Sequence, residues 1–214
     1  MANFVYLASQ SPRRRQLLEQ LGVRYELLLP DAGEDAEALE LVLKNETPTA
    51  YVKRVTRLKL NAAVARLAQR KLPPAPILCS DTTVALGRTI YGKPDDLQDA
   101  ERMLSDLAGK THRVLTAVAV QKASQRFEAL SSSRVSFEAM TIAQIRAYAV
   151  TGEPLGKAGA YAIQGRVAMH ITRINGSYSG IMGLPLWETA SLLQAAGFEI
   201  EHLPSDNNAT RNPD

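Results

Sequence analysis

The run from Ile77 to Leu86 is the feature that most constrains how this chain can fold. It is apolar at most positions, and it is followed by a turn signal at Gly87-Arg88 and by a second strand-like stretch at 89–91. A short apolar run bounded by turn residues is typical of a buried strand. The sequence therefore predicts a buried strand over 77–86 that continues into a hairpin.

Helix signals alternate with further strand-like runs along the chain. Ser11-Pro12 and Thr47-Pro48 each place a capping hydroxyl before a proline at the first helical position, and Gly22 fits just past the end of the first helix. Such alternation, together with hairpins, predicts an α/β fold with a mixed, twisted sheet and flanking helices. We expect further strands over 3–8, 113–121, 127–138 and about 166–174, and helices over 12–21, 48–71, 97–108, 141–151 and 185–196.

The length of 214 residues suits a single domain with two lobes that share one core. We expect this domain to span residues 1–203 and a disordered tail, almost free of apolar residues, to occupy 204–214. The acidic connection over 30–46 is expected to be flexible or partly helical. Cys79 is the only cysteine, which excludes a fold built on disulfides, and its apolar neighbours indicate a reduced core thiol.

Charge and hydropathy exclude several classes of function. The 25 basic and 22 acidic residues leave a net charge of +3, and only 6% of residues are aromatic, which argues against a nucleic-acid-binding module. No apolar run approaches the roughly 18 residues of a membrane span. The apolar stretch over 4–8 is too short for the core of a signal peptide. We therefore expect a cytoplasmic protein that has no nucleic-acid and no membrane partner.

Three consecutive arginines, Arg13 to Arg15, fall in the first turn of the predicted helix over 12–21. The positive end of the helix macrodipole disfavours a cation there by roughly 0.3–1 kcal/mol. One interpretation is a basic turn in contact with solvent. The other is an anion site, in which the free N–H groups of the helix start, the hydroxyls of Ser9 and Ser11 and the guanidinium groups bind a polyphosphate.

Asp81 places a carboxylate inside the predicted strand over 77–86. A buried carboxylate is costly unless it has partners. One interpretation is a structural carboxylate satisfied by Thr82, Thr83 and backbone donors. The sharper one is a metal-binding or proton-accepting carboxylate that lies at the carboxyl end of the strand and faces a cleft.

Two lysines and one glycine-rich segment complete the set of candidates. Lys59 lies on the flank of the apolar stripe of the helix over 48–71, where snorkelling to solvent also explains it. Lys93, in Gly-Lys-Pro, follows the hairpin on a rigid loop that suits phosphate binding. Small residues over 152–165 let the backbone approach another group closely, and Gln164 offers an amide that can both donate to and accept from a base edge. A tight structural turn is the alternative for this segment.

Taken together and in this order, the segments resemble the Maf family of nucleotide pyrophosphatases. The resemblance covers roughly residues 4–200, and the ordered set is far more specific than any one segment. The matching segments are Ala8-Ser9-Gln10-Ser11-Pro12-Arg13-Arg14, Tyr51-Val52 through Lys59, Ser80-Asp81-Thr82, Gly92-Lys93-Pro94, Leu107-Ala108-Gly109-Lys110-Thr111-His112, 152–165 and 176–189.

The resemblance implies hydrolysis of a nucleoside triphosphate between its α and β phosphates, with the monophosphate and pyrophosphate as products. It also implies a divalent cation, Mg²⁺ or Mn²⁺, a homodimer, and a two-lobed fold similar to that of inosine triphosphate pyrophosphatases with the site in the cleft. Asp81 matches the family's proton acceptor, and whether it also binds the metal stays open. The base-selecting positions match Arg13, Thr82 and Gln164, and the phosphate-contacting positions match Ser9, Ser11, Arg14, Lys59 and Lys93.

Within the family, the sequence looks like the branch that acts on dTTP and UTP. The branch that acts on 7-methyl-GTP tends to carry a tryptophan at the position of Arg13 and a glutamate-containing segment at that of Gln164. Two features depart from the usual pattern: Gly156 replaces an aspartate found in many relatives, and the connection over 31–46 is longer. Candidate metal partners in that connection are Glu34, Asp35 and Glu46.

The function expected from the sequence is therefore house-cleaning of the nucleotide pool by a dTTP/UTP pyrophosphatase, with modified pyrimidine nucleotides as further substrates. One alternative is the same chemistry on 7-methyl-GTP. Another is a non-catalytic nucleotide-binding regulator of cell division. Asp81 argues against the regulator, because binding phosphate requires no buried carboxylate.

Overall fold

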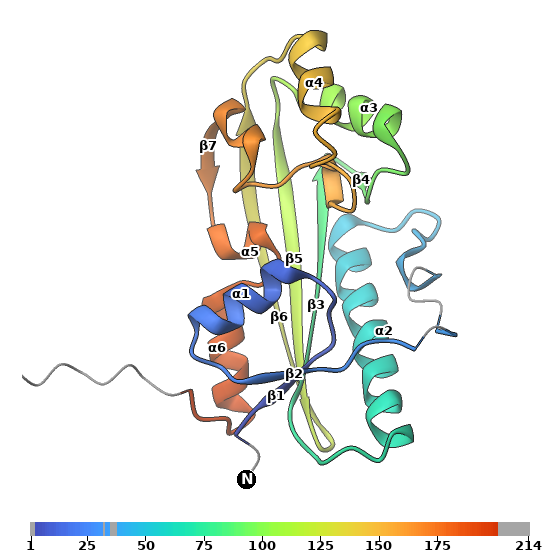
Figure 1. The fold of residues 1–214 in the computed structure, drawn as a ribbon, viewed down its shortest axis with the longest axis vertical. Helices are drawn as coiled ribbons and strands as arrows, with labels where there is room; N and C mark the ends of the chain where they lie inside the picture. Colours follow the sequence, from blue (N-terminus) through green and yellow to red (C-terminus); the bar gives the residue numbers. More distant parts are fainter. Residues whose placement is uncertain (1–2, 32, 35–37, 201–214) are drawn as a thin grey trace, which may run out of the picture.

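One mixed sheet runs the length of the molecule (Figure 1). The computed structural model describes residues 3–31, 33–34 and 38–200, and within them seven strands form the sheet in the order β2-β1-β3-β5-β6-β7, with β4 paired to β3. β1 (Val5–Leu7) is parallel to its neighbours β2 (Tyr25–Leu27) and β3 (Ile77–Leu86), whereas the pairs from β3 onward are antiparallel. The expected α/β fold with a mixed sheet and flanking helices is confirmed.

A long hairpin joins the two ends of the molecule. It consists of β5 (Thr111–Lys122) and β6 (Gln125–Phe137), and β3 pairs with β5 from Ile77 to Ala85. Because these three strands run through both lobes (Figure 1), the two lobes share one sheet instead of being joined by a linker.

The lower lobe in Figure 1 contains β1, β2 and three helices. α1 (Pro12–Gln20) and α6 (Leu186–Ala195) cover one face of the sheet, and α2 (Pro48–Gln69) covers the other. The alternation of side chains along a strand explains this division, because Leu78 packs on the α1 side and Cys79 on the α2 side. Two apolar clusters, one on each face, therefore form the core of this lobe.

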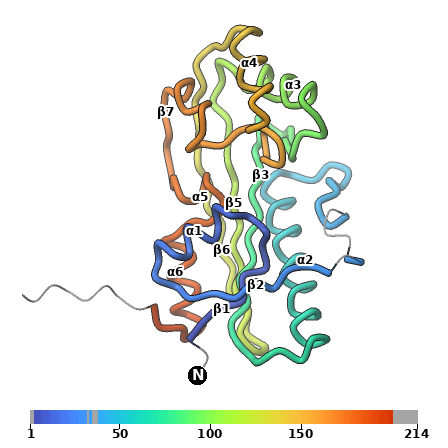
Figure 2. Tube along the Cα trace, in the orientation of Figure 1, coloured from blue at the N-terminus to red at the C-terminus, as the bar shows by residue number. Residues whose placement is uncertain are grey.

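The upper lobe is built on the far ends of the same strands. α3 (Leu97–Leu107) and α4 (Ile142–Ala149) pack there with β4 (Thr89–Tyr91) and β7 (Ile171–Asn175) around a third apolar cluster. Figure 2 shows how the chain then returns from β7 to the lower lobe beside α1. This return includes α5 (Tyr178–Met182) and brings the segment over 178–186 to the junction of the lobes.

The helix starts agree with the capping signals, with one exception in detail. Thr47 accepts a hydrogen bond from the backbone N–H of Ala50 at 3.2 Å, as expected for the cap of α2. Ser11 precedes α1 as predicted, but its hydroxyl makes no capping bond within the described chain. The hydroxyl of Ser11 and the first N–H groups of α1 are therefore available to a ligand.

The expectation for Cys79 as a core thiol is confirmed. Its side chain is fully buried, and burial raises the pKa of the thiol to about 12. A thiol with that pKa is not a nucleophile at neutral pH. Separately, none of the described helices is long and apolar enough to cross a membrane.

Short elements account for the differences between the predicted and observed folds. β2, α5 and the 3-10 helix η1 (Ala38–Glu40) were not predicted, because none is long enough to show a period in the sequence. The predicted strand over 166–174 is wrong in its first half, where η3 (Arg166–His170) forms a 3-10 helix before β7 begins. The predicted tail over 204–214 lies outside the described residues.

Candidate active site

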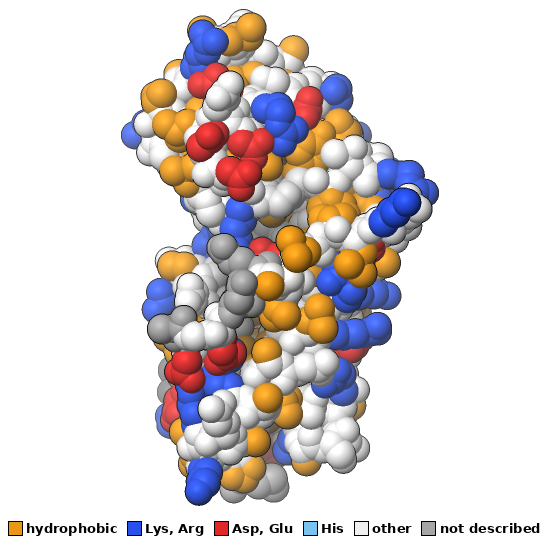
Figure 3. All heavy atoms as spheres, turned by 90° about the vertical axis from the view of Figure 1, so that its right-hand side faces the viewer, with side chains coloured by type: hydrophobic (Ala, Val, Ile, Leu, Met, Phe, Trp, Pro, Cys, Tyr) orange, Lys and Arg blue, Asp and Glu red, His pale blue; other side chains and the backbone are white. Residues whose placement is uncertain are grey.

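A cavity of about 960 Å³ lies where the two lobes meet. The space-filling view shows the surface hollowed between the lobes, with basic and acidic side chains inside the hollow (Figure 3). All of the residues that the sequence predicts for the site line this cavity: Ser9, Ser11, Arg13, Arg14, Lys59, Asp81, Thr82, Lys93 and Gln164. The third arginine of the turn, Arg15, is not among the lining residues.

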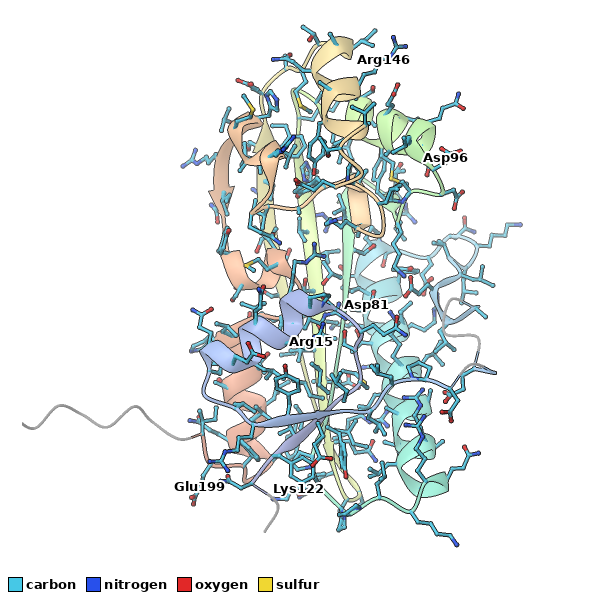
Figure 4. The ribbon with its side chains drawn as sticks, viewed as in Figure 1. Arg15, Asp81, Asp96, Lys122, Arg146 and Glu199 are labelled. Carbon is cyan, nitrogen blue, oxygen red and sulfur yellow. The ribbon has the colours of Figure 1, made fainter. Side chains whose placement is uncertain are left out.

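Asp81 lies in the middle of the molecule, between α1 and α2 (Figure 4). Only 6% of its surface is exposed, and its Oδ1 accepts a hydrogen bond from Nζ of Lys59 at 2.5 Å. The expectation that Asp81 ends its strand is wrong: it pairs with Ala117 within β3, which continues into the upper lobe. The structural alternative is also corrected, because the side-chain partner of Asp81 is Lys59 and not Thr82 or Thr83.

Lys59 joins Asp81 to a second carboxylate that the sequence analysis missed. Its ammonium donates to Oε1 of Glu40 at 2.7 Å, and Lys93 lies 3.2 Å from the other oxygen of Glu40. Burial disfavours the charged ammonium, but the carboxylates of Asp81 and Glu40 outweigh burial and raise the pKa of Lys59. Burial likewise opposes the charge of Glu40, but Lys59 and then Lys93 together outweigh burial, so the pKa of Glu40 is lowered. Lys59 and Glu40 are therefore both charged at neutral pH.

The acidic connection contributes Glu40 rather than the carboxylates that were expected. Glu46 is bound by Arg54 at 2.7 Å. Glu34 lines the cavity, but Arg66 binds it at 2.5 Å and, as the largest cause, lowers the pKa of Glu34 to about 2. Asp35 lies outside the described residues. Among the residues that are described, no group of three or more His, Cys, Asp or Glu side chains is placed to hold a metal ion.

Glu40 is placed by contact with α2, not by any local signal. The hydroxyl of Tyr51 in α2 donates to the backbone carbonyl of Glu40 at 2.9 Å, which fixes η1 against the helix that carries Lys59. No spacing rule distinguishes Glu40 from the other acidic residues of the connection. Its only sequence signal is its position a few residues before a helix whose first turn matches a family motif.

Arg14 and Ser9 connect the start of α1 to the returning chain. Nε of Arg14 donates to the carbonyl of Gly183 at 2.8 Å, and one of its terminal nitrogens donates to Oγ of Ser9 at 3.0 Å. Oγ of Ser9 also accepts from the backbone N–H of Ser11 at 3.2 Å. Arg14 is therefore part of the architecture of the site as well as a cation beside the cavity.

Arg13 differs from Arg14 because one of its buried donors has no hydrogen-bond partner among the described residues. Its Nε is buried and has no hydrogen-bond partner within the described residues. An unsatisfied buried donor costs about 1–3 kcal/mol, so it is retained where a ligand supplies the acceptor. Burial also lowers the pKa of Arg13. Arg13 therefore lines the cavity and retains one buried N–H group that has no partner among the described residues.

The direction in which the hydroxyl of Thr82 donates its hydrogen bond is fixed. Oγ1 of Thr116 donates to the carbonyl of Gly180 at 2.7 Å, which uses its only proton. Oγ1 of Thr82 lies 3.0 Å from Oγ1 of Thr116 and must therefore be the donor in that pair. Its remaining capacity is as an acceptor, so Thr82 can accept a hydrogen bond from a ligand.

Gln164 belongs to the upper-lobe wall of the cavity and is exposed. It lies in a turn closed by a hydrogen bond from the N–H of Gly165 to the carbonyl of Ala162 at 2.9 Å. The segment just before it approaches β3 closely: a Cβ on Gly159 would lie 2.8 Å from a methyl carbon of Val84. The expected close backbone approach in the glycine-rich segment is therefore confirmed at Gly159.

Comparisons with known proteins point to one family. The family described as Maf-like protein matches residues 4–196. A protein of Albidiferax ferrireducens named dTTP/UTP pyrophosphatase is 67% identical over 200 residues, which cover 94% of this chain and 100% of that protein. A protein of Polaromonas sp. with the same name is 69% identical over 199 residues, 93% of this chain and 98% of that protein.

One solved structure shows a distant likeness. The Ham1 protein of Staphylococcus aureus is 10% identical, with a TM-score of 0.37 over 62% of this chain and 71% of that chain. A likeness at this level supports no conclusion about fold or function.

Proposed function

The chain belongs to the Maf family, and we propose that it hydrolyses dTTP and UTP to the nucleoside monophosphate and pyrophosphate. The observation that carries the proposal is the meeting of Asp81, Lys59 and Glu40 at the centre of a cavity also lined by arginines and hydroxyls. A buried carboxylate and a half-buried one beside several cations are suited to reaction at a phosphate, not merely to holding one.

The phosphate-binding part of the proposal rests on the lower-lobe wall and on Lys93. Arg14, Lys59 and Lys93 supply positive charge, and Ser9 and Ser11 supply hydroxyls beside the N-terminus of α1. A triphosphate offsets the repulsion among these cations, and the free N–H groups of the helix start favour an anion. In the reaction, these groups neutralise the charge that develops on the leaving pyrophosphate.

The donor set fits a divalent cation. The carboxylates of Asp81 and Glu40 already converge on one positive charge, the Lys59 ammonium. Mg²⁺ is usually bound by one or two carboxylates together with substrate phosphates, so Asp81 and Glu40 suit this cation. Asp81 and Glu40 would hold the ion. When bound, it neutralises phosphate charge and makes a water easier to ionise.

Asp81 is the proposed general base. Its burial and its position at the cavity suit it to accept a proton from the attacking water. The second carboxylate reduces the difficulty that one residue would have to be both the metal ligand and the base, because Glu40 shares the cation and leaves an oxygen of Asp81 free to accept the proton. Lys59 then contacts phosphate in place of its present partners.

Base selection is assigned to Arg13, Thr82 and Gln164. Thymine and uracil present an imide N–H between two carbonyls. The acceptor on Thr82 suits the N–H, the guanidinium of Arg13 suits a carbonyl, and the amide of Gln164 can serve either. Cytosine presents an acceptor at the imide position, which would face the acceptor of Thr82. A mismatch of this kind costs about 1–3 kcal/mol, enough for roughly tenfold to a hundredfold discrimination.

Product analysis tests the reaction type. The protein is incubated with dTTP and Mg²⁺, and the products are separated by ion-exchange chromatography. The proposal requires dTMP and pyrophosphate in equal amounts. Formation of dTDP and phosphate would assign a different phosphatase activity, and binding of dTTP without any product would favour the non-catalytic regulator.

A further inference from the structure

The turn that carries Gln164 has no regular structure to hold it. Ala162 to Gly165 forms a single turn between two 3-10 helices, η2 (Ala158–Ala160) and η3. Gln164 itself is exposed, so its neighbours in the turn must fix the direction of its amide. An amide reads a base only if its direction is fixed, because a freely rotating amide accepts either hydrogen-bonding pattern.

Two side chains outside the cavity fix this turn at both ends. The hydroxyl of Tyr148, in α4, accepts from the N–H of Ala162 at 3.4 Å and donates to Oε1 of Glu153 at 2.8 Å. Both carboxylate oxygens of Glu153 accept from the N–H of Arg166 at 3.2 Å, immediately after the turn. One tyrosine–glutamate pair therefore binds the first residue of the turn and the residue that follows it.

Gly165 shows how closely the carboxylate approaches the turn. A Cβ built on Gly165 would lie 1.7 Å from Oε1 and 2.4 Å from Cδ of Glu153. The carboxylate thus occupies the space of a side chain at the last residue of the turn. Because Gly165 has negative φ, an alanine there is acceptable to the backbone and would act only by displacing Glu153.

The same pair is linked to the second base-selecting residue. Tyr148 is buried and lies close enough to Arg13 for the two to interact electrostatically. Burial, and then the hydrogen bond to Glu153, raise the pKa of Tyr148, so its hydroxyl keeps its proton and the direction of its hydrogen bonds. Tyr148 therefore binds the turn of Gln164 and also interacts electrostatically with Arg13.

We propose that Glu153 and Tyr148 are positioning residues for base selection: they clamp the turn 162–165 so that the amide of Gln164 meets the imide edge of the base. The inference rests on the proposed function and deepens it. Neither residue lines the cavity, so neither contacts the substrate. Loss of the clamp should affect the choice between bases more than the handling of the triphosphate, which the other wall of the cavity provides.

The test compares Glu153→Gln, Tyr148→Phe and Gly165→Ala with the wild type on UTP and CTP, which differ only in the base edge. Glutamine places an NH₂ donor against the N–H of Arg166, phenylalanine removes the hydroxyl, and alanine displaces the carboxylate. In each variant we expect the ratio of kcat/KM for UTP over CTP to fall at least about fivefold, mainly through a higher KM for UTP.

Glu138→Gln is the matched control. Glu138 binds His170 at 2.7 Å, at the other end of η3, so this variant removes a carboxylate that contacts the same short helix without touching the turn. Its UTP/CTP ratio should equal that of the wild type. Melting temperatures of all variants separate loss of the clamp from general destabilisation. If one clamp variant fails to fold, the other two carry the test.

The outcomes distinguish the two proposals. If the wild type prefers UTP and the clamp variants keep that preference while only their melting temperatures fall, the clamp is structural and the inference is wrong. If the wild type hydrolyses neither nucleotide or does not prefer UTP, the proposed function fails and the inference fails with it. A fall in the ratio in Glu138→Gln equal to that in the clamp variants would also overturn it.

Discussion

The ammonium of Lys59 lies 2.5 Å from a carboxylate oxygen of Asp81. Among the described residues, Asp81 forms no other ion pair. The same ammonium lies 2.7 Å from Glu40. Lys59 of α2 therefore places its positive charge between two carboxylates, one from β3 and one from η1. Removing Lys59 from this partly buried group is unfavourable, because it leaves the buried Asp81 without its ion-pair partner.

Replacement of Lys59 by methionine should strengthen metal binding in the absence of nucleotide. The two carboxylates lose their internal cation, and a divalent ion relieves the repulsion between them. We expect the Kd for Mn²⁺, measured by electron paramagnetic resonance titration without nucleotide, to fall at least about tenfold. Lys53→Met, on an exposed position of the same helix, is the control and should bind Mn²⁺ like the wild type. Equal Mn²⁺ affinities for Lys59→Met and the wild type would contradict this account of the carboxylate pair.

Replacement of Arg13 by alanine and replacement of Arg14 by alanine should have different effects on stability. Removal of a cation from the start of a helix is by itself neutral or stabilising, and this holds for Arg13, whose Nε has no partner in the described chain. Arg14→Ala instead removes the bonds to Gly183 and Ser9 and should destabilise by about 1–3 kcal/mol. Thermal unfolding measures the difference, and both variants should lower kcat/KM for dTTP at least about tenfold. Equal melting temperatures would show that the Arg14 contacts contribute nothing to the fold.

Thr116→Val should relax discrimination against cytosine. Valine removes the acceptor that orients the hydroxyl of Thr82, which can then turn and donate to the ring nitrogen of cytosine. We expect the UTP/CTP ratio of kcat/KM to fall about tenfold. Thr116→Ser keeps the hydroxyl and should preserve the ratio, and a serine variant as relaxed as the valine variant would rule out the proposed orientation.

Acid should destabilise the protein through His112. This histidine is buried against Phe137 and Tyr161, and burial lowers its pKa to about 4 from an unfolded value of about 6.5. Below 6.5 the unfolded chain binds the proton first, so the stabilisation is complete above that pH and is lost as the pH falls towards 4. In thermal unfolding between pH 7 and pH 4, His112→Phe should therefore lose less stability than the wild type. Identical losses would mean that His112 does not titrate in this range.

Apolar runs and capping residues predicted most of the helices and strands, because these elements are determined by residues close together in the sequence. The strand over 77–86 agrees with β3 residue for residue, and Thr47-Pro48 marks the start of α2. The first half of the predicted strand over 166–174 is wrong because the turn before it is held by Glu153, a contact that no local pattern contains.

The candidate site divides in the same way. Its arginine turn, Asp81 and Gln164 follow from residue type and from the family motifs, and they line one cavity. Glu40 was missed because its place is fixed by Tyr51, which lies 11 residues further along the chain. The local sequence could not have shown that Arg14 binds Gly183, because the two residues meet only when the returning chain lies beside α1.

The most direct test of the account is the release of pyrophosphate from dTTP, UTP, CTP, GTP and ATP in parallel with Mg²⁺, with Asp81→Asn as the inactive control. The account predicts that dTTP and UTP are hydrolysed at least about tenfold more efficiently than the other three, and that Asp81→Asn retains less than about a tenth of the wild-type kcat while folding normally. Equal efficiency on GTP and dTTP, or substantial turnover by Asp81→Asn, would contradict it.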